Sequence, residues 1–309
     1  MINQKAAVTG GAGFIGSHLA EALAAQNFHV TIIDDLSSGK LENIKPLADK
    51  VQFVKGTVTD LPALRKLFRG VDYVFHMAAI ASVPKSIKDP LTSHEVDVTG
   101  TMNVLLAAAE NKAKKVILAS SAAVYGDSPV SPKQEDMLPC PLSPYAVDKL
   151  AAENYCRVLG QLHDMPTVCL RYFNVYGPRQ DPNSQYAAVI PKFITSVLAG
   201  QPPVIFGDGE QTRDFVYIKD VLNANILAAR SNACGVFNIS GGKSITLNEL
   251  ADLIIKLAGN RLKPIYQGAR QGDIRHSLAD ISKAAAFGYE PHYSLSDGLA
   301  ETLKWYQNK

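Results

Sequence analysis

Two hydrophobic patterns alternate along the first half of the chain. Short, nearly unbroken apolar runs occupy residues 5–10, 29–35, 51–56, 71–79, 114–121 and 167–174. Between them, residues 14–26, 62–70, 100–112 and 146–163 carry apolar side chains at helical spacing, as Ile15, Leu19 and Leu23 do. Unbroken apolar runs separated by helices are typical of parallel strands that are buried on both faces. The pattern therefore predicts an α/β fold with a parallel sheet covered by helices on both sides.

The pattern changes after Asn174. The segment "VYGPRQDPNSQY" at 175–186 is rich in turn formers, and the helices and strands that follow are less regular. We expect one domain over residues 1–172 and a second, smaller α/β substrate lobe over 173–309. The chain is expected to cross back to the first domain around 214–240.

Composition narrows the class of protein. The 309 residues suffice for two lobes around a cleft, and 47% hydrophobic with 19% charged residues indicates a compact globular chain. A net charge of +2 without a basic run disfavours nucleic acid as a partner. The N-terminus lacks a signal-like apolar core, and no apolar stretch reaches the length of a membrane span. These features predict a cytoplasmic protein without a membrane partner.

The residues that commonly bind metals are scattered. Four cysteines show no metal-ligand spacing and are interpreted as reduced packing residues: Cys140, Cys156, Cys169 and Cys234. The seven histidines form no recognisable metal or catalytic set, and His76, which ends an apolar strand, is interpreted as a hydrogen-bonded core residue. No metal site is predicted.

The segment "TGGAGFIG" at 9–16 lies between the first expected strand and the first expected helix. Gly10, Gly13 and Gly16 have the spacing with which a tight turn lets backbone approach a pyrophosphate at a helix N-terminus. Asp34 ends the next strand, where a carboxylate accepts hydrogen bonds from an adenosine ribose and repels a 2′-phosphate. The sequence thus predicts a Rossmann-type, doubly wound domain that binds NAD rather than NADP. The competing interpretation is that the glycines serve only the packing of a strand-to-helix turn and that Asp34 is a solvated residue at the end of a strand.

The segment "SPYAVDK" at 143–149 places Tyr145 and Lys149 four residues apart, on one face of a helix. An ammonium group beside a phenol favours the ionised phenol. Taken alone, this spacing is common on helical surfaces, so its meaning depends on the other motifs.

Four segments together carry a family resemblance: "TGGAGFIG", "SSAAVYG", "YAVDK" and "RYFNVYGPRQ". Over nearly its whole length the chain resembles the extended short-chain dehydrogenase/reductases, and within them the UDP-glucose and UDP-N-acetylglucosamine 4-epimerases. Further similar segments are "GDGEQTRDFVYIKD" and "RQGDIRHS". The resemblance implies an NAD-dependent isomerase that epimerises UDP-hexoses at C4 through a transient 4-keto sugar.

The resemblance also assigns roles to residues. It implies that Ser121 hydrogen-bonds the sugar O4, that Tyr145 takes its proton, and that Lys149 contacts the nicotinamide ribose and favours the tyrosinate. Ala122 and Ala123 stand where related dehydratases carry an acidic pair. Because alanine transfers no proton, 4,6-dehydration is not expected.

The cofactor-binding residues implied by the glycine motif and the resemblance are Gly10, Gly13, Phe14, Ile15, Gly16, Asp34, Asp35, Ser38, Gly39, Thr57, Val58, Ala78, Ala79, Ala81, Tyr145, Lys149, Tyr172 and Phe173. Three positions depart from the family pattern. Thr57 replaces a frequent acid that reads adenine, so that Val58 backbone or Asp60 would compensate. Ala81 replaces a lysine of some epimerases, and Asp97 stands where asparagine is frequent.

The implied substrate-binding residues are Ser82, Ser121, Asn174, Ala188, Val189, Val204, Phe206, Arg213, Arg270, Asp273 and Ser277. Arg213 and Arg270 would clamp the diphosphate, since a guanidinium binds phosphate oxygens in pairs. Ser277 matches the position that gates the hexose pocket, and a small residue there leaves room for a 2-acetamido group. We therefore expect activity on UDP-GlcNAc and UDP-GalNAc as well as on UDP-Glc and UDP-Gal.

Two alternatives remain at this point. One is a UDP-glucuronate 4-epimerase or related nucleotide-sugar oxidoreductase, in which Arg179 or Arg275 would face a carboxylate. The other is a non-enzymatic, NAD-sensing regulator, which would not need the set Ser121, Tyr145 and Lys149. The resemblance further implies a homodimer formed through the helices at 100–112 and 146–163.

Overall fold

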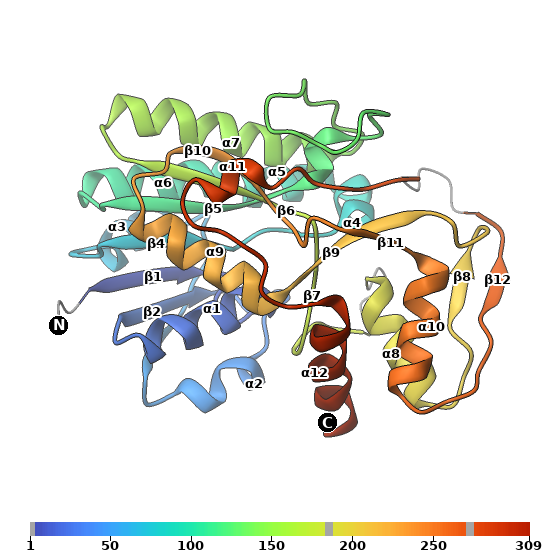
Figure 1. Cartoon of the computed structure of the whole chain (residues 1–309). Helices are drawn as coiled ribbons and strands as arrows, with labels where there is room; N and C mark the ends of the chain where they lie inside the picture. Colours follow the sequence, from blue (N-terminus) through green and yellow to red (C-terminus); the bar gives the residue numbers. More distant parts are fainter. Residues whose placement is uncertain (1–3, 183–187, 270–274) are drawn as a thin grey trace.

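The computed structural model describes residues 4–182, 188–269 and 275–309. The first domain is built on a seven-stranded parallel sheet with the order β10-β6-β5-β4-β1-β2-β3 (Figure 1). Its strands are β1 Lys5–Thr9, β2 His29–Asp34, β3 Val51–Lys55, β4 Tyr73–His76, β5 Lys115–Ser121, β6 Thr167–Tyr172 and β10 Gly235–Ile239. The six strands predicted from the apolar runs are present, and the α/β, Rossmann-type fold is confirmed.

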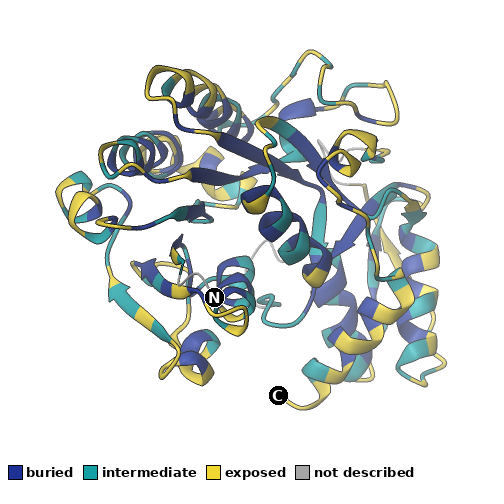
Figure 2. Cartoon of the chain, turned by 60° about the vertical axis from the view of Figure 1, so that its left-hand side comes forward, coloured by how far each residue is buried: buried dark blue, intermediate teal, exposed yellow. Residues whose placement is uncertain are grey.

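Helices cover both faces of this sheet because neighbouring strand residues point to opposite sides. In β1, Ala6 and Val8 pack with α1 (Phe14–Ala25) and α9 (Ile218–Arg230), whereas Ala7 packs on the opposite side. That opposite side is covered by α3 (Leu61–Leu67), α6 (Gly100–Glu110) and α7 (Pro144–Leu162). Figure 2 shows the buried sheet enclosed between helices whose outer faces are exposed.

Shorter elements connect these layers. Between β2 and β3 lie α2 (Leu41–Ile44) and a 3₁₀ turn (Lys45–Leu47), and a second 3₁₀ turn (Ala122–Tyr125) follows β5. Between β4 and α6 come α4 (Val83–Lys88), α5 (Pro90–His94) and a π-helical turn (Glu95–Thr99). The hydrophobic periodicity did not predict the segment 83–99 as helical, because its turns are short and their outer faces are exposed.

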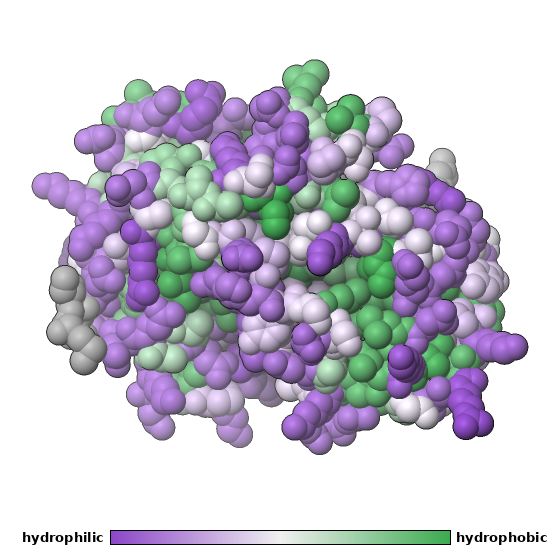
Figure 3. Space-filling model, in the orientation of Figure 1, coloured by the Kyte–Doolittle hydropathy of each residue, from purple (hydrophilic) through white to green (hydrophobic). Residues whose placement is uncertain are grey.

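The smaller lobe lies beside the carboxyl ends of the strands, at the lower right of Figure 1. Its elements are α8 (Val189–Leu198), β8 (Val204–Phe206), α10 (Leu247–Leu257), β12 (Ile265–Gln267) and α12 (Leu295–Gln307). A three-stranded sheet of the order β11-β9-β7 joins β11 (Ser244–Thr246), β9 (Thr212–Tyr217) and β7 (Asn174–Tyr176). The short helix α11 (Ser282–Ala285) packs near β10. On the face seen in Figure 3, hydrophilic atoms predominate, with apolar atoms gathered over the smaller lobe.

The order of the strands determines where a ligand binds. From β1 the chain moves outward to β2 and β3, and then returns to β4 on the other side of β1. In such sheets the loops at this reversal leave a crevice beyond the carboxyl ends of the strands. The glycine loop follows β1, and residues 77–82 follow β4, so both segments border the reversal point.

Among the described residues, no helix is both long enough and apolar enough to cross a membrane. The four cysteines are free thiols. His76 is buried, and its ring nitrogens lie 2.7 Å from Thr9 Oγ1 and 2.9 Å from Thr101 Oγ1. It is therefore the hydrogen-bonded core residue that the sequence predicts. Burial lowers the pKa of His76 to about 3, so the ring stays neutral in the folded protein.

Candidate active site

The glycine loop packs closely against the strand beside it. Gly10 has a φ of +65°, and a Cβ built there would lie 2.7 Å from Cα of Ala78. Only glycine permits both that backbone conformation and that close approach. Gly13 and Gly16 then begin α1, while Ala78, Ala79 and Ala81 follow β4 opposite the loop. Phe14 and Ile15 form the first turn of α1, next to these residues.

Asp34 is held firmly at the end of β2. Its Oδ2 accepts from Ala12 N at 2.9 Å and its Oδ1 from Leu36 N at 2.8 Å, and the side chain is buried. Burial raises the pKa of Asp34, while these two N–H groups oppose the rise. A Cβ on Gly39 would lie 2.5 Å from Asp34 Oδ1, so the 34–39 loop folds tightly around the carboxylate. The interpretation of Asp34 as a solvated strand end is thus wrong.

The neighbours of Asp34 are more open. Asp35 is exposed, and its Oδ1 accepts from Ser37 N at 2.8 Å; Ser38 follows directly. After the next strand, β3, Thr57 Oγ1 lies 3.0 Å from Thr59 Oγ1, and Val58 is buried. Asp60 caps α3 by accepting from Ala63 N at 3.0 Å. Because the Asp60 carboxylate already caps α3, it is a poor substitute for the adenine-reading acid that Thr57 replaces.

Asp97 supplies a test of whether the site fits a dinucleotide. Its Oδ1 accepts from Ile80 N at 2.7 Å, whereas its buried Oδ2 has no hydrogen-bond partner among the described residues. Burial raises the pKa of Asp97, and the nearby charge of Lys149 lowers it. A buried carboxylate oxygen without a partner indicates a donor that arrives with a ligand or water. Together with the Gly10 turn and the buried Asp34, it fits NAD.

Ser121, Tyr145 and Lys149 come from two elements that meet above the sheet. Ser121 ends β5, and its Oγ accepts from Ala123 N at 3.1 Å, so it also caps the turn that follows. The Nζ of Lys149 donates to the carbonyl of Ala119 at 3.0 Å and lies 5.8 Å from the ring centroid of Tyr145. The Tyr145 hydroxyl makes no hydrogen bond to any described residue, and its side chain is half-buried. It is therefore available to a ligand.

The start of α7 fixes the position of Tyr145. Ser143 caps the helix by accepting from Ala146 N at 3.3 Å, and Pro144 occupies the first helical turn. Tyr145 N donates to Ser86 Oγ at 3.0 Å, which ties α7 to α4. Ser82 in turn caps α4 by accepting from Lys85 N at 3.3 Å.

Sequence reasoning missed two supports of α7. One is Ser86; the other is the buried Asp148, which accepts from Ser93 Oγ at 2.8 Å and lies 3.1 Å from His94 Nδ1. Ser86 and the partners of Asp148 all lie in the short turns at 83–99. No periodic signal identified them, because their contacts depend on how those turns pack on α7.

Three consecutive residues, beginning with the last residue of β6, have different contacts. Tyr172 is buried, and its hydroxyl lies 3.1 Å from Asn225 Oδ1 on α9. Burial raises the pKa of this phenol above its ordinary value. Phe173 packs on Tyr125 with ring centroids 6.3 Å apart. Asn174 begins β7, and its Nδ2 donates to the carbonyl of Asp214 at 2.9 Å.

The proposed diphosphate and hexose residues converge through β9. Asn174 pairs with Phe215 in the β7–β9 ladder, and Arg213 lies two residues earlier on β9. Ser277 N donates to Thr212 O at 3.2 Å, so Ser277 lies beside the start of the same strand. Asp214 Oδ2 accepts from Ala279 N at 3.0 Å, which attaches the 275–281 segment to β9. Asn174, Arg213 and Ser277 are thereby brought together from three distant parts of the sequence.

The remaining predicted substrate residues lie in the smaller lobe. Ala188 caps α8, Val189 begins it, and Val204 and Phe206 are the ends of β8, which pairs with β12 in parallel. Arg270 and Asp273 lie outside the described residues.

Comparison with known proteins agrees with this arrangement. Residues 6–240 match the model of the NAD dependent epimerase/dehydratase family. The chain belongs to this family, which confirms the class of protein and the cofactor, NAD.

Among individual relatives, the UDP-glucose 4-epimerase of Mycolicibacterium smegmatis is 39% identical over 309 residues, covering 98% of each chain. The structure of UDP-N-acetylglucosamine 4-epimerase from Methanobrevibacter ruminantium, in complex with UDP-N-acetylmuramic acid, has a TM-score of 0.96 at 45% identity. It covers 100% of this chain and 99% of that one. A UDP-glucuronic acid 4-epimerase from Bacillus cereus, in complex with UDP-glucuronic acid and NAD, has a TM-score of 0.91 at 35% identity, with 99% of each chain covered.

Proposed function

We propose that this protein is an NAD-dependent isomerase that interconverts C4 epimers of UDP-hexoses, namely UDP-Glc with UDP-Gal and UDP-GlcNAc with UDP-GalNAc. The observation that carries the proposal is the Tyr145 hydroxyl, which has no hydrogen-bond partner among the described residues, beside the Lys149 ammonium, on a helix that packs against the strand ending at Ser121. Family membership and the epimerases among the relatives support it.

The chain's own groups have defined tasks in this reaction. Bound NAD supplies a hydride acceptor that returns the hydride within the same cycle. Tyr145 takes the proton of the sugar 4-hydroxyl, and Ser121 orients that hydroxyl. Lys149 contributes positive charge beside the phenol. After the 4-keto sugar has rotated so that its opposite face would meet the cofactor, Tyr145 returns the proton to O4.

The turn after Ser121 supports epimerisation over dehydration. Ala122 and Ala123 occupy the 3₁₀ turn that directly follows the serine. Neither side chain transfers a proton, so this turn offers no acid or base for the loss of water from the sugar.

Two arginines disfavour the glucuronate alternative. Arg275 forms a two-pronged ion pair with Asp208, with contacts of 2.9 and 2.8 Å. Arg179 pairs with Glu21 on α1 at 2.5 Å. Because both guanidinium groups are engaged by the protein's own carboxylates, neither is free for a sugar carboxylate, and neutral hexoses are the favoured substrates.

We further propose that the smaller lobe holds the UDP moiety. Arg213 and Asn174 would bind the diphosphate together with Arg270, while Val204 and Phe206 would pack on uracil and Asp273 would accept from the uridine ribose. The NAD site would be formed by the residues around Gly10, Asp34, Thr57 and Ala78. On this proposal the NAD-binding domain is residues 1–172 and the UDP-sugar domain is 173–309, with the chain crossing back to the first domain around 214–240, where α9 and β10 lie.

We also propose a cytoplasmic homodimer. Large apolar side chains are exposed along one side of α7, at Val147, Tyr155, Val158 and Leu162. Leu91 on the neighbouring α5 is exposed as well. An apolar stripe of this kind on two adjacent helices favours a helical interface with a second copy. The free thiols favour a reducing compartment.

A turnover assay tests the proposed function. Purified protein is incubated with NAD and, separately, with UDP-Glc, UDP-GlcNAc and UDP-glucuronate, and the C4 epimers are separated by chromatography. We expect turnover of the first two. Exclusive turnover of the uronate would favour the alternative epimerase, and no turnover of any UDP-sugar would refute the proposal.

A further inference from the structure

The carboxylate of Glu153 on α7 joins the ends of two central strands. It accepts from Ser120 Oγ at 2.5 Å, from Arg171 Nε at 2.9 Å and from Arg171 Nη2 at 2.7 Å. Ser120 lies on β5 and Arg171 on β6, and all three side chains are buried. Three donors thus converge on one carboxylate away from water.

Each partner in this cluster is next to a residue of the proposed active site. Tyr145, Lys149 and Glu153 follow one another at intervals of four along α7, so they lie in successive turns on one side of the helix. Ser120 directly precedes Ser121. Lys149 binds the carbonyl of Ala119, and Glu153 binds the hydroxyl of Ser120. These two hydrogen bonds, made to consecutive residues of β5, therefore fix the position of α7 along the end of that strand.

Arg171 extends the cluster to the turn behind Ser121. Its guanidinium lies over the ring of Tyr125, 4.7 Å from the centroid. The Tyr125 hydroxyl donates to Asn238 Oδ1 at 2.7 Å, and Asn238 Nδ2 donates to the carbonyl of Asp280 at 3.1 Å. Burial opposes the charge of Arg171, but the bonds to Glu153 raise the pKa of Arg171 above its ordinary value, so the guanidinium keeps its charge.

A buried ion pair of this kind is weak evidence for stability, since apolar side chains of similar volume often serve as well. The distinctive property of this cluster is geometric, because the Glu153 carboxylate, the Arg171 guanidinium and the Ser120 hydroxyl can make all their mutual hydrogen bonds in only one arrangement. Catalytic groups lose about a hundredfold in rate when displaced by about 1 Å.

We propose that Glu153 is a positioning residue, which through Ser120 and Arg171 holds Ser121 at its working distance from Tyr145 and Lys149. The inference rests on the proposed function, because the three active groups are those assigned there.

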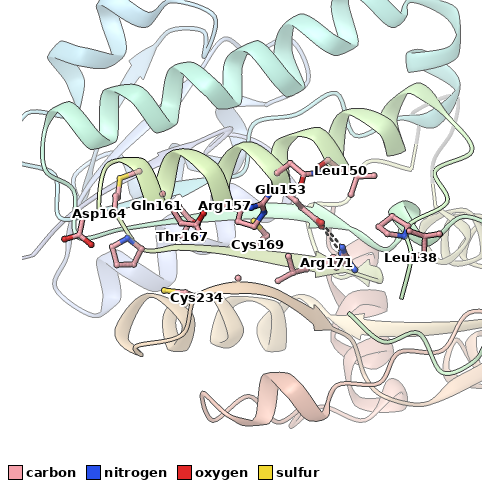
Figure 4. Close-up of a pocket in the computed structure, with 17 residues that line it drawn as sticks. Leu138, Leu150, Glu153, Arg157, Gln161, Asp164, Thr167, Cys169, Arg171 and Cys234 are labelled. Atoms are coloured by element: carbon pink, nitrogen blue, oxygen red, sulfur yellow. Dashed lines mark hydrogen bonds and ion pairs between the residues drawn. The ribbon is translucent and has the colours of Figure 1, made fainter. Parts of the chain in front are cut away.

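The surroundings of the pair make the proposal testable by chemical rescue. Glu153 and Arg171 line a cavity of about 760 Å³ between α7, β6 and β10 (Figure 4). Leu138 and Leu150 lie at the end near the ion pair, and Asp164 and Thr167 lie at the other end. Such a volume admits a small carboxylate to the space that Glu153→Ala would leave beside Arg171.

The experiment compares Ser120→Ala, Glu153→Ala and the control Asn154→Ala. Asn154 lines the same cavity, but its amide donates to Leu150 O within α7. We expect kcat to fall about tenfold in Ser120→Ala and about a hundredfold in Glu153→Ala. KM for the UDP-sugar should change less than threefold by this reasoning, and the control should match the wild type. Formate or acetate should restore kcat of Glu153→Ala in a saturable manner, but not that of Tyr145→Phe.

Unchanged kcat in Ser120→Ala would overturn the proposal, even if Glu153→Ala fails to fold. The proposal would also be overturned if the activity of Glu153→Ala falls only in proportion to the amount of folded protein and formate does not restore it. A wild-type protein without C4 epimerase activity would instead refute the proposed function.

Discussion

The Nζ of Lys149 lies 5.8 Å from the ring centroid of Tyr145 and is anchored to the carbonyl of Ala119, which is two residues before Ser121. The relationship joins the proposed base, its neighbouring cation and the strand that carries the serine. We therefore expect Tyr145, whose hydroxyl has no partner among the described residues, to be the most sensitive single position for catalysis.

Tyr145→Phe should lower kcat for UDP-Glc epimerisation by about 10²–10⁴-fold, because it removes the group that transfers the proton. The melting temperature should change little, since no bond to a described residue is lost. Tyr73→Phe, at the start of β4 and thus at the opposite end of that strand from residues 77–82, is the matched control. Equal activity of Tyr145→Phe and wild type would refute the assignment of the base.

Gly39→Ala should weaken NAD binding. The new Cβ would lie 2.5 Å from Asp34 Oδ1 and 2.9 Å from Ala12 Cβ, so the carboxylate must move. Overpacking of this kind costs about 1–3 kcal/mol, which corresponds to a roughly 5- to 150-fold rise in the Kd for NAD. Isothermal titration calorimetry of the cofactor-free protein with NAD measures this Kd. Gly268→Ala, where a Cβ meets open space, is the control. An unchanged Kd would argue against Asp34 as the ribose ligand.

Ser277→Tyr should suppress turnover of UDP-GlcNAc while sparing UDP-Glc, because the larger side chain fills the space proposed for the 2-acetamido group. We expect kcat/KM for the acetylated sugar to fall by about tenfold or more relative to the plain one. Ser277→Ala should retain both activities. An equal loss of both substrates in Ser277→Tyr would contradict the pocket assignment.

Asp214 should make stability depend on pH between about 4 and 6. Burial raises the pKa of Asp214 from 3.8 to about 6, against the N–H of Ala279. The folded state therefore binds a proton that the unfolded state has released, and the associated stability is fully present below pH 3.8 and lost as pH rises through 6. The difference is about 3 kcal/mol.

Denaturant titrations of wild type and Asp214→Asn across this range isolate the effect from other groups. The free energy of unfolding of wild type, relative to the variant, should fall by most of that amount as pH rises from 4 to 7. Parallel curves for the two proteins would show that Asp214 titrates normally.

Charges on the apolar side of α7 should disrupt the proposed dimer. In Val158→Lys with Leu162→Lys, two ammonium groups would have to leave water at the interface, which is costly without partners. Sedimentation should show a dimer for the wild type and a monomer for the double variant. Ile265→Lys, at an exposed position at the start of β12 in the smaller lobe, should remain dimeric. A monomeric wild type would refute the proposed dimer.

Local patterns in the sequence sufficed to predict much of the structure of the first domain. The apolar runs predicted six of its parallel strands, because strands buried on both faces are mostly apolar; β6 is buried at every position, with Thr167 and Arg171 as its polar exceptions. The glycine loop, Tyr145 and Lys149 were identifiable because phosphate approach and helical spacing each require fixed intervals along one segment. Likeness to a family then assigned Ser121, Asn174 and Ser277, which no periodicity identifies.

Tertiary structure decided the rest, because it depends on segments far apart in the chain. Residue 277 reaches β9 through Thr212, and Asp214 binds Ala279 across 65 positions. Glu153 meets Ser120 and Arg171 only when α7 packs over both strands. For Asp34 the sequence left a solvated strand end as the alternative interpretation, and the burial of its carboxylate by the 34–39 loop excludes that alternative. The sequence specifies which groups can react, whereas the packing of distant elements determines which groups meet and which are removed from water.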